Sequence, residues 1–215
     1  TSYTRKLFEV YFMDDSRLEN PIEQAFGDLI TERAKDFDLV IVTDFGHGLI
    51  SPKIVDTLVA NSRFLAVNTQ VNAGNQGFNL ISKYPRADYV CLDEPEARLA
   101  VSDKYTDLAA IAARHLPEII DCDKIVITQG RHGCIASAAE QSSTRIPALT
   151  DKVVDTIGAG DAFLSLAAVC HGAGVDPELA SFLGSVSAAL DVQIVGNSEP
   201  IDPIALHKYV VSLLK

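Results

Sequence analysis

The stretch VVDTIGAGDAF, from Val153 to Phe163, places two glycines and an aspartate where an extended run turns into an apolar, helix-like one. Two small residues in such a turn let a ligand approach the backbone closely. The backbone amides of 158–161, at the start of a helix, would point at a phosphoryl group and stabilise its negative charge. Asp161 would stay ionised there and accept the proton of an attacking hydroxyl. The stretch therefore predicts transfer of a phosphoryl group to an alcohol.

Two other nucleotide-binding motifs do not match the sequence. A Walker A loop needs the string G-x-x-x-x-G-K-[ST], and the chain contains none. The Rossmann fingerprint needs a glycine or alanine three positions after the second glycine, where Phe163 stands. Its acidic residue, about 20 positions further on, should end a second strand. Glu178 has that spacing but opens a helical pattern, so dinucleotide binding is disfavoured.

Strand-like and helical patterns alternate from about residue 22 onward. Continuous apolar runs predict buried strands at 38–44, 63–69, 87–93 and 124–130, and a hairpin at 133–139 and 143–149. Helical patterns cover 51–62, 94–101, 106–120, 161–172, 176–191 and 203–214. This alternation predicts an α/β fold, a mostly parallel sheet with helices on both faces. Ligands of such sheets bind at the carboxyl ends of the strands, where we expect Asp44, Asp93, Gly130 and the glycine turn.

Composition limits the class of partner. The 215 residues carry a net charge of −11, which argues against nucleic acid and anionic membranes but not against a small phosphorylated ligand. No run approaches the roughly 18 apolar residues of a membrane span, and the start lacks a secretory pattern, so we expect a cytoplasmic protein. The cysteines and histidines form no C-x-x-C, H-x-x-H or H-E-x-x-H spacing, which disfavours a zinc site and disulfides.

The segment DTIGAGDAF (155–163) resembles the signature D-T-x-G-A-G-D-x-F of the ribokinase (pfkB) family of carbohydrate kinases. The resemblance implies a ribokinase-like three-layer sandwich that binds ATP and Mg²⁺ and phosphorylates a sugar or sugar phosphate. It implies Asp161 as catalytic base, with Gly158, Ala159 and Gly160 as the anion hole. Asp155, which opens the signature, is expected to orient the loop or a monovalent cation.

CLDEPEARLAV (91–101) resembles the family's N-x-x-E segment, with Asp93 in the Asn place and Glu96 in the Glu place. By this resemblance Glu96 helps to organise Mg²⁺ and phosphates through water, and Asp93 contacts the nucleotide. Asp93 also adds negative charge where the family has a neutral amide. A solvated acidic helix start, favoured by the helix dipole, is the alternative interpretation.

Two further stretches match nucleotide-binding parts of the family. VITQGRHG (126–133) resembles its T-x-G-x-x-G segment and implies nucleotide contacts at Thr128, Gly130 and Gly133. A plain strand end followed by a turn is the alternative. QIVGNSEP (193–200) lies where the family closes over the adenine, which implies a contact from Asn197.

VTDFGHGLIS (42–51) resembles the D-Y-x-K-G-x-[LI] stretch of the heptose 7-phosphate kinase branch, and implies substrate contacts from Asp44 and His47. Phe45 replaces the Tyr and His47 replaces the Lys of that pattern. Histidine is a poorer permanent cation than lysine, and a structural role in the loop is an equal alternative for His47. The polar segment 68–79 is long for a loop and is expected to line the cleft.

The resemblance covers nearly the whole chain, so we expect 1–215 to form a single ribokinase-like domain. It covers only the later part of the family pattern, because the N-terminal sugar-binding region and most of a small β lid are not seen. Phe8, Val10 and Phe12 alternate as in a strand, and 1–13 would be the last lid strand. Such an unpaired strand would seek a second copy, which predicts a homodimer. The H-x-G-H string of the nucleotidyltransferase often fused to this branch does not occur.

Two functions from different classes follow. The first is an ATP-dependent carbohydrate kinase with Asp161 as its base. The second is a non-catalytic nucleotide-binding module, either a fragment or a pseudokinase, in which phosphate binding persists but the acceptor hydroxyl is poorly positioned.

Overall fold

A six-stranded sheet organises the part of the chain that the computed structural model describes, which comprises residues 8, 10, 12–14, 16–72, 74–75, 77–138 and 143–215. The strand order follows the sequence: β1 (Val40–Asp44), β2 (Leu65–Thr69), β3 (Tyr89–Asp93), β4 (Lys124–Thr128), β5 (Cys134–Ala138) and β6 (Thr144–Ile146). The first four strands are parallel, and β5 and β6 form an antiparallel hairpin beside β4. The predicted mostly parallel sheet with its hairpin is confirmed.

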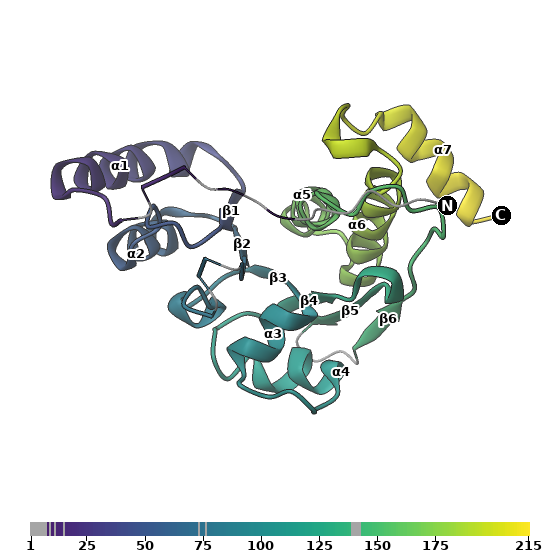
Figure 1. The fold of residues 1–215 in the computed structure, drawn as a ribbon, viewed down its shortest axis with the longest axis horizontal. Helices are drawn as coiled ribbons and strands as arrows, with labels where there is room; N and C mark the ends of the chain where they lie inside the picture. The colour runs from purple at the N-terminus through teal and green to yellow at the C-terminus, as the bar shows by residue number, and fades with distance from the viewer. Residues whose placement is uncertain are drawn as a thin grey trace.

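Helices cover both faces of this sheet (Figure 1). On one face lie α2 (Pro52–Asn61), α3 (Glu94–Ala100) and α4 (Leu108–Ala110), and on the other α5 (Ala159–Gly172) and α6 (Pro177–Asp191). The helix α1 (Asn20–Arg33) packs on α2, and α7 (Pro203–Leu213) packs on α6. Short helical turns are η1 (Ala34–Asp36), η2 (Ile81–Lys83), η3 (Ile111–His115), η4 (Gly130–His132) and η5 (Val195–Asn197). The three-layer arrangement agrees with the predicted sandwich.

The central strands are apolar at nearly every position because alternate residues along each strand pack into different hydrophobic cores, one on each face of the sheet. In β2, Leu65 and Val67 join the core under α2 and α3, whereas Ala66 faces α5. In β3, Leu92 joins the core under α2 and α3, whereas Tyr89 joins the core under α5. Each fully buried aliphatic side chain of this size stabilises the fold by about 1.5–3 kcal/mol. Both faces of the central strands are therefore held by packing.

Three expected elements differ in the structure. The run 153–156 is not a strand: the amides of Val154 and Asp155 donate to the carbonyl of Val192, at 2.8 and 3.1 Å, so this segment is tied to the end of α6. The glycine turn thus does not follow a strand of the sheet. The expected helix 106–120 is α4 followed by the π-helical turn η3, and Asp107 is its N-cap. The strand expected at 124–130 ends at Thr128.

The start of the chain contributes no strand among its described residues. Phe8, Val10 and Phe12 are exposed and lie outside any strand. Residues 1–7, 9 and 11 of the expected lid strand lie outside the described residues. The homodimer that this strand was expected to form stays a prediction. No described helix has the length and apolar character needed to cross a membrane.

Candidate active site

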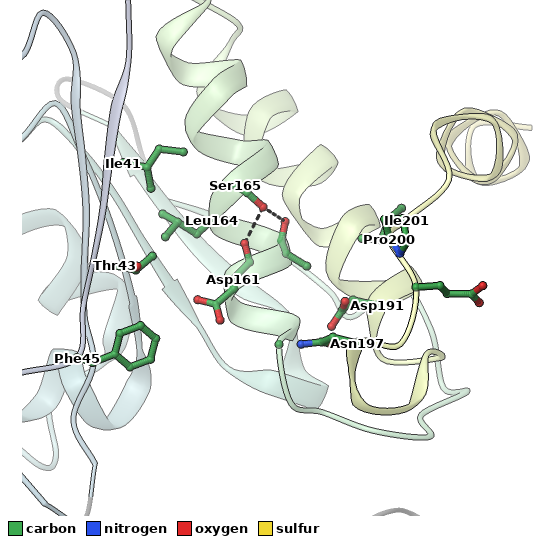
Figure 2. A pocket seen from close by; sticks show the side chains of 13 residues that line it. Ile41, Thr43, Phe45, Asp161, Leu164, Ser165, Asp191, Asn197, Pro200 and Ile201 are labelled. Atoms are coloured by element: carbon green, nitrogen blue, oxygen red, sulfur yellow. Dashed lines mark hydrogen bonds between the residues drawn. The ribbon is translucent and has the colours of Figure 1, made fainter. Parts of the chain in front are cut away.

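An open cleft of about 640 Å³ lies where the end of β1 faces the start of α5 and the end of α6 (Figure 2). Its walls come from three separate stretches of the chain, which are 41–45, 158–165 and 191–201. Ile41, Thr43 and Phe45 point from the β1 side, opposite the carboxylates of Asp161 and Asp191 (Figure 2). Residues that are far apart in the sequence therefore line the same cleft.

Asp161 lies in the first turn of α5 with its carboxylate directed into the cleft (Figure 2). The residue is exposed, yet the cleft walls partly desolvate its carboxylate and raise its pKa. A carboxylate with a raised pKa is a stronger base, which suits removal of a proton from a hydroxyl. The structure thus places the predicted base where a ligand can reach it.

The glycine turn starts the same helix. Gly158 has a φ of 94°, in the left-handed region, and the first backbone bond of α5 runs from the amide of Ala162 to the carbonyl of Gly158, at 2.9 Å. The amides of the preceding residues therefore have no partner inside the helix. Around Gly160, no described atom apart from its chain neighbours and its own helix backbone lies within 4 Å of the position that a Cβ would occupy.

The space beside Gly158 is filled by a side chain. A Cβ at Gly158 would lie 2.4 Å from Nδ2 of Asn197, so the absent side chain leaves room for this carboxamide. Asn197, in η5, has a φ of 50° and lines the same cleft. The space beside Gly158, where we expected a ligand to approach the backbone, is therefore taken by the side chain of Asn197.

Asp155 joins the turn to the loop that carries Asn197. Its Oδ1 accepts from the amide of Ile157 at 3.1 Å, and its Oδ2 accepts from the amide of Gly196 at 3.0 Å. These bonds lower the pKa of Asp155. The carboxylate thus holds the segment before the turn against η5, in agreement with the orienting role that we expected.

Asp93 and Glu96 form a capping box at the start of α3. The amide of Glu96 donates to Oδ1 of Asp93 at 2.7 Å, and the amide of Asp93 donates to Oε2 of Glu96 at 2.8 Å. Oε1 of Glu96 also accepts from the amide of Val71, at 3.2 Å. Burial, with the charges of Asp93 and Asp161, raises the pKa of Glu96 to about 7.

The T-x-G-x-x-G stretch lies at the end of β4, and its residues do not line the cleft described above. Thr128 donates from Oγ1 to the carbonyl of Leu92 at 3.4 Å. Gly130 has open space around it, whereas a Cβ at Gly133 would lie 1.9 Å from the carbonyl oxygen of Ile146. Gly133 is therefore required by the packing of the β4–β5 turn against the end of β6.

Asp44 is directed inward. It is 2% exposed, its Oδ2 accepts from the hydroxyl of Tyr84 at 2.7 Å and pairs with Lys83, and its Oδ1 accepts from the amide of Gly46 at 3.0 Å. Burial and the Asp44 charge raise the pKa of Tyr84. His47 is half-buried in the loop after β1 and does not line the cleft. Neither side chain therefore lines the cleft that contains Asp161.

The chain matches the pfkB family carbohydrate kinases over residues 52–204, which is well over half of its length. The chain belongs to the pfkB family. This span includes the capping box, the β4 turn, the glycine turn and Asn197. The predicted family and fold are thus confirmed, although 40–51, with β1 and the loop after it, lie outside the matched span.

Curated relatives of this pfkB chain include proteins named bifunctional protein HldE. The chain is 28% identical over 179 residues to the one from Nitrobacter winogradskyi and 26% identical over 199 residues to one from Rhodopseudomonas palustris. These matches cover 82% and 91% of this chain but 36% and 40% of the relatives. The chain therefore spans well under half of the length of the proteins it matches.

Solved pfkB-like structures share the fold at low identity. Phosphofructokinase-2 from Escherichia coli in complex with potassium has a TM-score of 0.77 at 12% identity, covering 93% of this chain and 64% of that one. Ribokinase from Thermotoga maritima has a TM-score of 0.69 at 20% identity, covering 86% and 61%. These likenesses support the ribokinase-like sandwich.

The acidic groups around the site fit a cation held through water or phosphate. Burial raises the pKa of Asp93 and Glu96, and their mutual interaction and the charge of Asp161 raise that of Glu96 further. A hard cation would offset this repulsion. The described part of the chain contains no group of three or more acidic, histidine or cysteine side chains that could chelate a metal directly.

Asp191 is a site residue that we did not predict. It ends α6, lines the cleft and is 8% exposed. Burial raises its pKa, as do the charges of Asp161 and Asp155. The one signal in the sequence was an acidic residue at the end of an apolar helix, where the helix dipole disfavours negative charge.

Proposed function

We propose that the chain carries the phosphoryl-transfer site of an ATP-dependent carbohydrate kinase that acts on the hydroxyl of a sugar or sugar phosphate. The observation that supports this most directly is Asp161, directed into the cleft from the same helix start that carries the glycine turn. Membership of the pfkB family supports the same reaction class.

Each part of the turn has a distinct role in this proposal. Asp161 accepts the proton of the acceptor hydroxyl, and its raised pKa favours that transfer. The free amides around Gly158, Ala159 and Gly160 stabilise the charge on the transferring phosphoryl group. Asp155 keeps the turn in place, beside a monovalent cation where one binds. Positioning by a rigid helix start supplies much of the rate enhancement in phosphoryl transfer.

The nucleotide is proposed to lie on the side of Thr128, Gly130, Gly133 and Asn197. Bound Mg²⁺ would neutralise charge on the phosphates, and Glu96 and Asp93 are the residues that would hold it through water. Glu96 suits this role because its two oxygens are already oriented by the amides of Val71 and Asp93. Asn197 would leave its contact with Gly158 or share it with the nucleotide.

Heptose 7-phosphate is the acceptor that we propose within this class. It is supported by the likeness of 42–51 to the heptose-phosphate branch and by the similarity to HldE proteins. The buried pairing of Asp44 favours a structural role for that residue, so sugar contacts would come from other parts of the whole protein.

A non-catalytic nucleotide-binding module is the second candidate. The contact between Asn197 and Gly158 favours it, because this carboxamide occupies the space through which a phosphoryl group would approach the turn. The two candidates differ in whether bound nucleotide is turned over.

Calorimetric titration with ATP and Mg²⁺, followed by a phosphoryl-transfer assay with sugar phosphates, separates the two candidates. We expect the chain and its Asp161→Asn variant to bind nucleotide with similar affinity, since the amide keeps the shape of the carboxylate. Transfer should fall by about 10²–10⁴-fold in the variant, the contribution of a general base. Nucleotide binding without transfer in either protein supports the non-catalytic module, and no binding contradicts both candidates.

A further inference from the structure

The β1 side of the cleft is formed by every second residue of the strand and its end. Ile41, Thr43 and Phe45 are exposed and line the cleft, whereas Val42 between them is buried, as expected when successive side chains of a strand point to opposite faces. Phe45 is 40% exposed, and its ring points into the cleft opposite the carboxylate of Asp161 (Figure 2). The surface that faces Asp161 is therefore mainly apolar and carries an aromatic ring.

The backbone of Phe45 is held in place by two carboxamides from another loop. Its carbonyl accepts from Nδ2 of Asn75 at 3.0 Å and from Nδ2 of Asn72 at 3.4 Å. The next residue, Gly46, has a φ of 73°, and a Cβ there would lie 2.7 Å from Nδ2 of Asn75 and from Cβ of Asn79. This packing keeps the ring at the cleft and away from the core. An aromatic side chain that is fixed in advance on a concave surface loses little freedom when a ligand packs against it.

The groups that line the rest of the cleft limit what can bind against this ring. They include the acids Asp161, Asp191 and Glu199, and no lysine, arginine or histidine is among the described lining residues. A phosphate group here would meet acids without a compensating cation. A sugar ring fits better, because it offers C–H groups to the face of an aromatic ring, which carries partial negative charge, and hydroxyl groups to carboxylates.

We propose that Phe45 is a specificity-determining residue for the acceptor. Its ring packs against the C–H face of the sugar and thereby directs a hydroxyl group toward Asp161 on the opposite side of the cleft. The acceptor therefore binds in this cleft through an uncharged part that carries hydroxyl groups. Where the acceptor has a phosphate, that phosphate lies outside the cleft, because the described lining residues offer it no positive side chain.

This proposal deepens the proposed function by assigning a residue that recognises the acceptor, and in this it rests on that function. Its main test measures sugar binding without nucleotide and needs no turnover. A chain that binds sugar against Phe45 but transfers no phosphoryl group would contradict the proposed function alone. A chain that transfers phosphoryl groups with the same acceptor KM after loss of the ring would contradict the role of Phe45 alone.

The test is a saturation-transfer NMR titration of the chain with ribose, fructose 6-phosphate and heptose 7-phosphate. Phe45→Leu removes the ring and keeps an apolar side chain, and Phe45→Tyr keeps the ring. Phe78→Leu is the matched control, because Phe78 is an aromatic residue that is 94% exposed and does not line the cleft. We expect at least one of the sugars to bind the wild type, with its ring C–H protons receiving saturation from aromatic protons of the protein.

Phe45→Leu should bind that sugar about three- to tenfold more weakly, the usual contribution of an aromatic contact, and its acceptor KM should rise by the same factor. Phe45→Tyr and Phe78→Leu should bind it as the wild type does. The affinity for ATP with Mg²⁺ and the unfolding midpoint should be the same in all four proteins, whereas a merely structural role of the ring would change both.

Three results would overturn the proposal. They are equal sugar affinity in the wild type and Phe45→Leu, weaker binding of ATP to Phe45→Leu, which would place the nucleotide against the ring, and a wild type that binds none of the three sugars.

Discussion

His171 is buried in α5 against the ring of Tyr89, with ring centroids 4.4 Å apart. Neither of its ring nitrogens has a hydrogen-bond partner among the described residues. Burial lowers the pKa of His171 to about 4, with the charge of Lys124 contributing in the same direction. The imidazole is therefore neutral in the folded protein at pH 7, and its protonation opposes folding.

The free energy of unfolding should fall as the pH is lowered from about 6.5, the pKa of an unfolded histidine, toward 4. In this window the unfolded chain binds a proton at His171 that the folded chain does not, so acid favours unfolding. Each pKa unit corresponds to about 1.4 kcal/mol. Urea unfolding of the wild type and of His171→Phe across this range measures the effect. The raised pKa values of Asp161 and Asp191 act in the opposite direction in both proteins.

The difference between the two proteins therefore isolates His171. We expect the wild type to lose on the order of 2 kcal/mol relative to His171→Phe between the two limits. Parallel pH profiles would show that the imidazole is protonated inside the fold or exposed to water.

Alanine substitutions of Gly133 and Gly130 test how each glycine of the turn after β4 contributes to stability. Both have positive φ, at 85° and 54°, but only Gly133 abuts the carbonyl of Ile146. Gly133→Ala should cost about 3 kcal/mol or more in the free energy of unfolding, because the backbone of β6 must shift. Gly130→Ala, in open space, should cost about 1 kcal/mol from its backbone conformation alone. Equal costs in urea unfolding would contradict this assignment.

At the scale of elements, strands were predictable wherever both faces are buried, since β2, β3 and β4 then read as continuous apolar runs. Val153 and Val154 gave the same signal, but the amides of Val154 and Asp155 donate to Val192 at the end of α6, a pairing set by tertiary contacts. The π-helical turn at 111–115 keeps the helical pattern of its sequence. Local pattern therefore predicts burial better than it predicts the hydrogen-bond partner.

The segment 68–79 was expected to line the cleft, but none of its described residues does so, and its role emerged only from the structure. Asn75 donates to the carbonyls of Phe45 and Gln70, at 3.0 and 2.8 Å. The buried Asn79 donates to the carbonyl of Asp44 at 2.6 Å and accepts from Lys83 at 2.7 Å. These bonds brace the loop behind Phe45, which lines the cleft.

Asn79→Ala should therefore destabilise the fold by about 2–3 kcal/mol, because it removes a buried hydrogen bond to the carbonyl of Asp44 and one from the charged ammonium of Lys83. Amide hydrogen exchange should accelerate in 45–50 and 70–79 more than in the strands. Asn61→Ala removes one carboxamide bond, to Thr57 within α2, and serves as the control. A uniform change in exchange across the sheet would mean that Asn79 supports the whole core and not this loop.

At the scale of the whole molecule, the cleft is assembled from stretches more than a hundred residues apart, such as 41–45 and 158–165. The glycine turn could be identified because its proposed catalytic base and its amides are contiguous in sequence. Asp191 could not, because its significance depends on facing Asp161 and Asp155 across the fold. The inward pairing of Asp44 with Lys83 is hidden from the sequence for the same reason.

The whole chain carries a net charge of −11, and its cleft is lined by acids, yet the proposed nucleotide is an anion. Without a metal ion, the protein field should repel ATP, and added salt should screen that repulsion. Metal-free ATP should therefore bind more tightly at about 200 mM than at about 20 mM salt, the reverse of binding to a basic site.

With Mg²⁺ the repulsion is offset, so affinity should rise and depend less on salt. Calorimetric titrations with EDTA or Mg²⁺ at the two salt levels measure both effects. Weaker metal-free binding at the higher salt would show instead that basic side chains outside this cleft hold the phosphates.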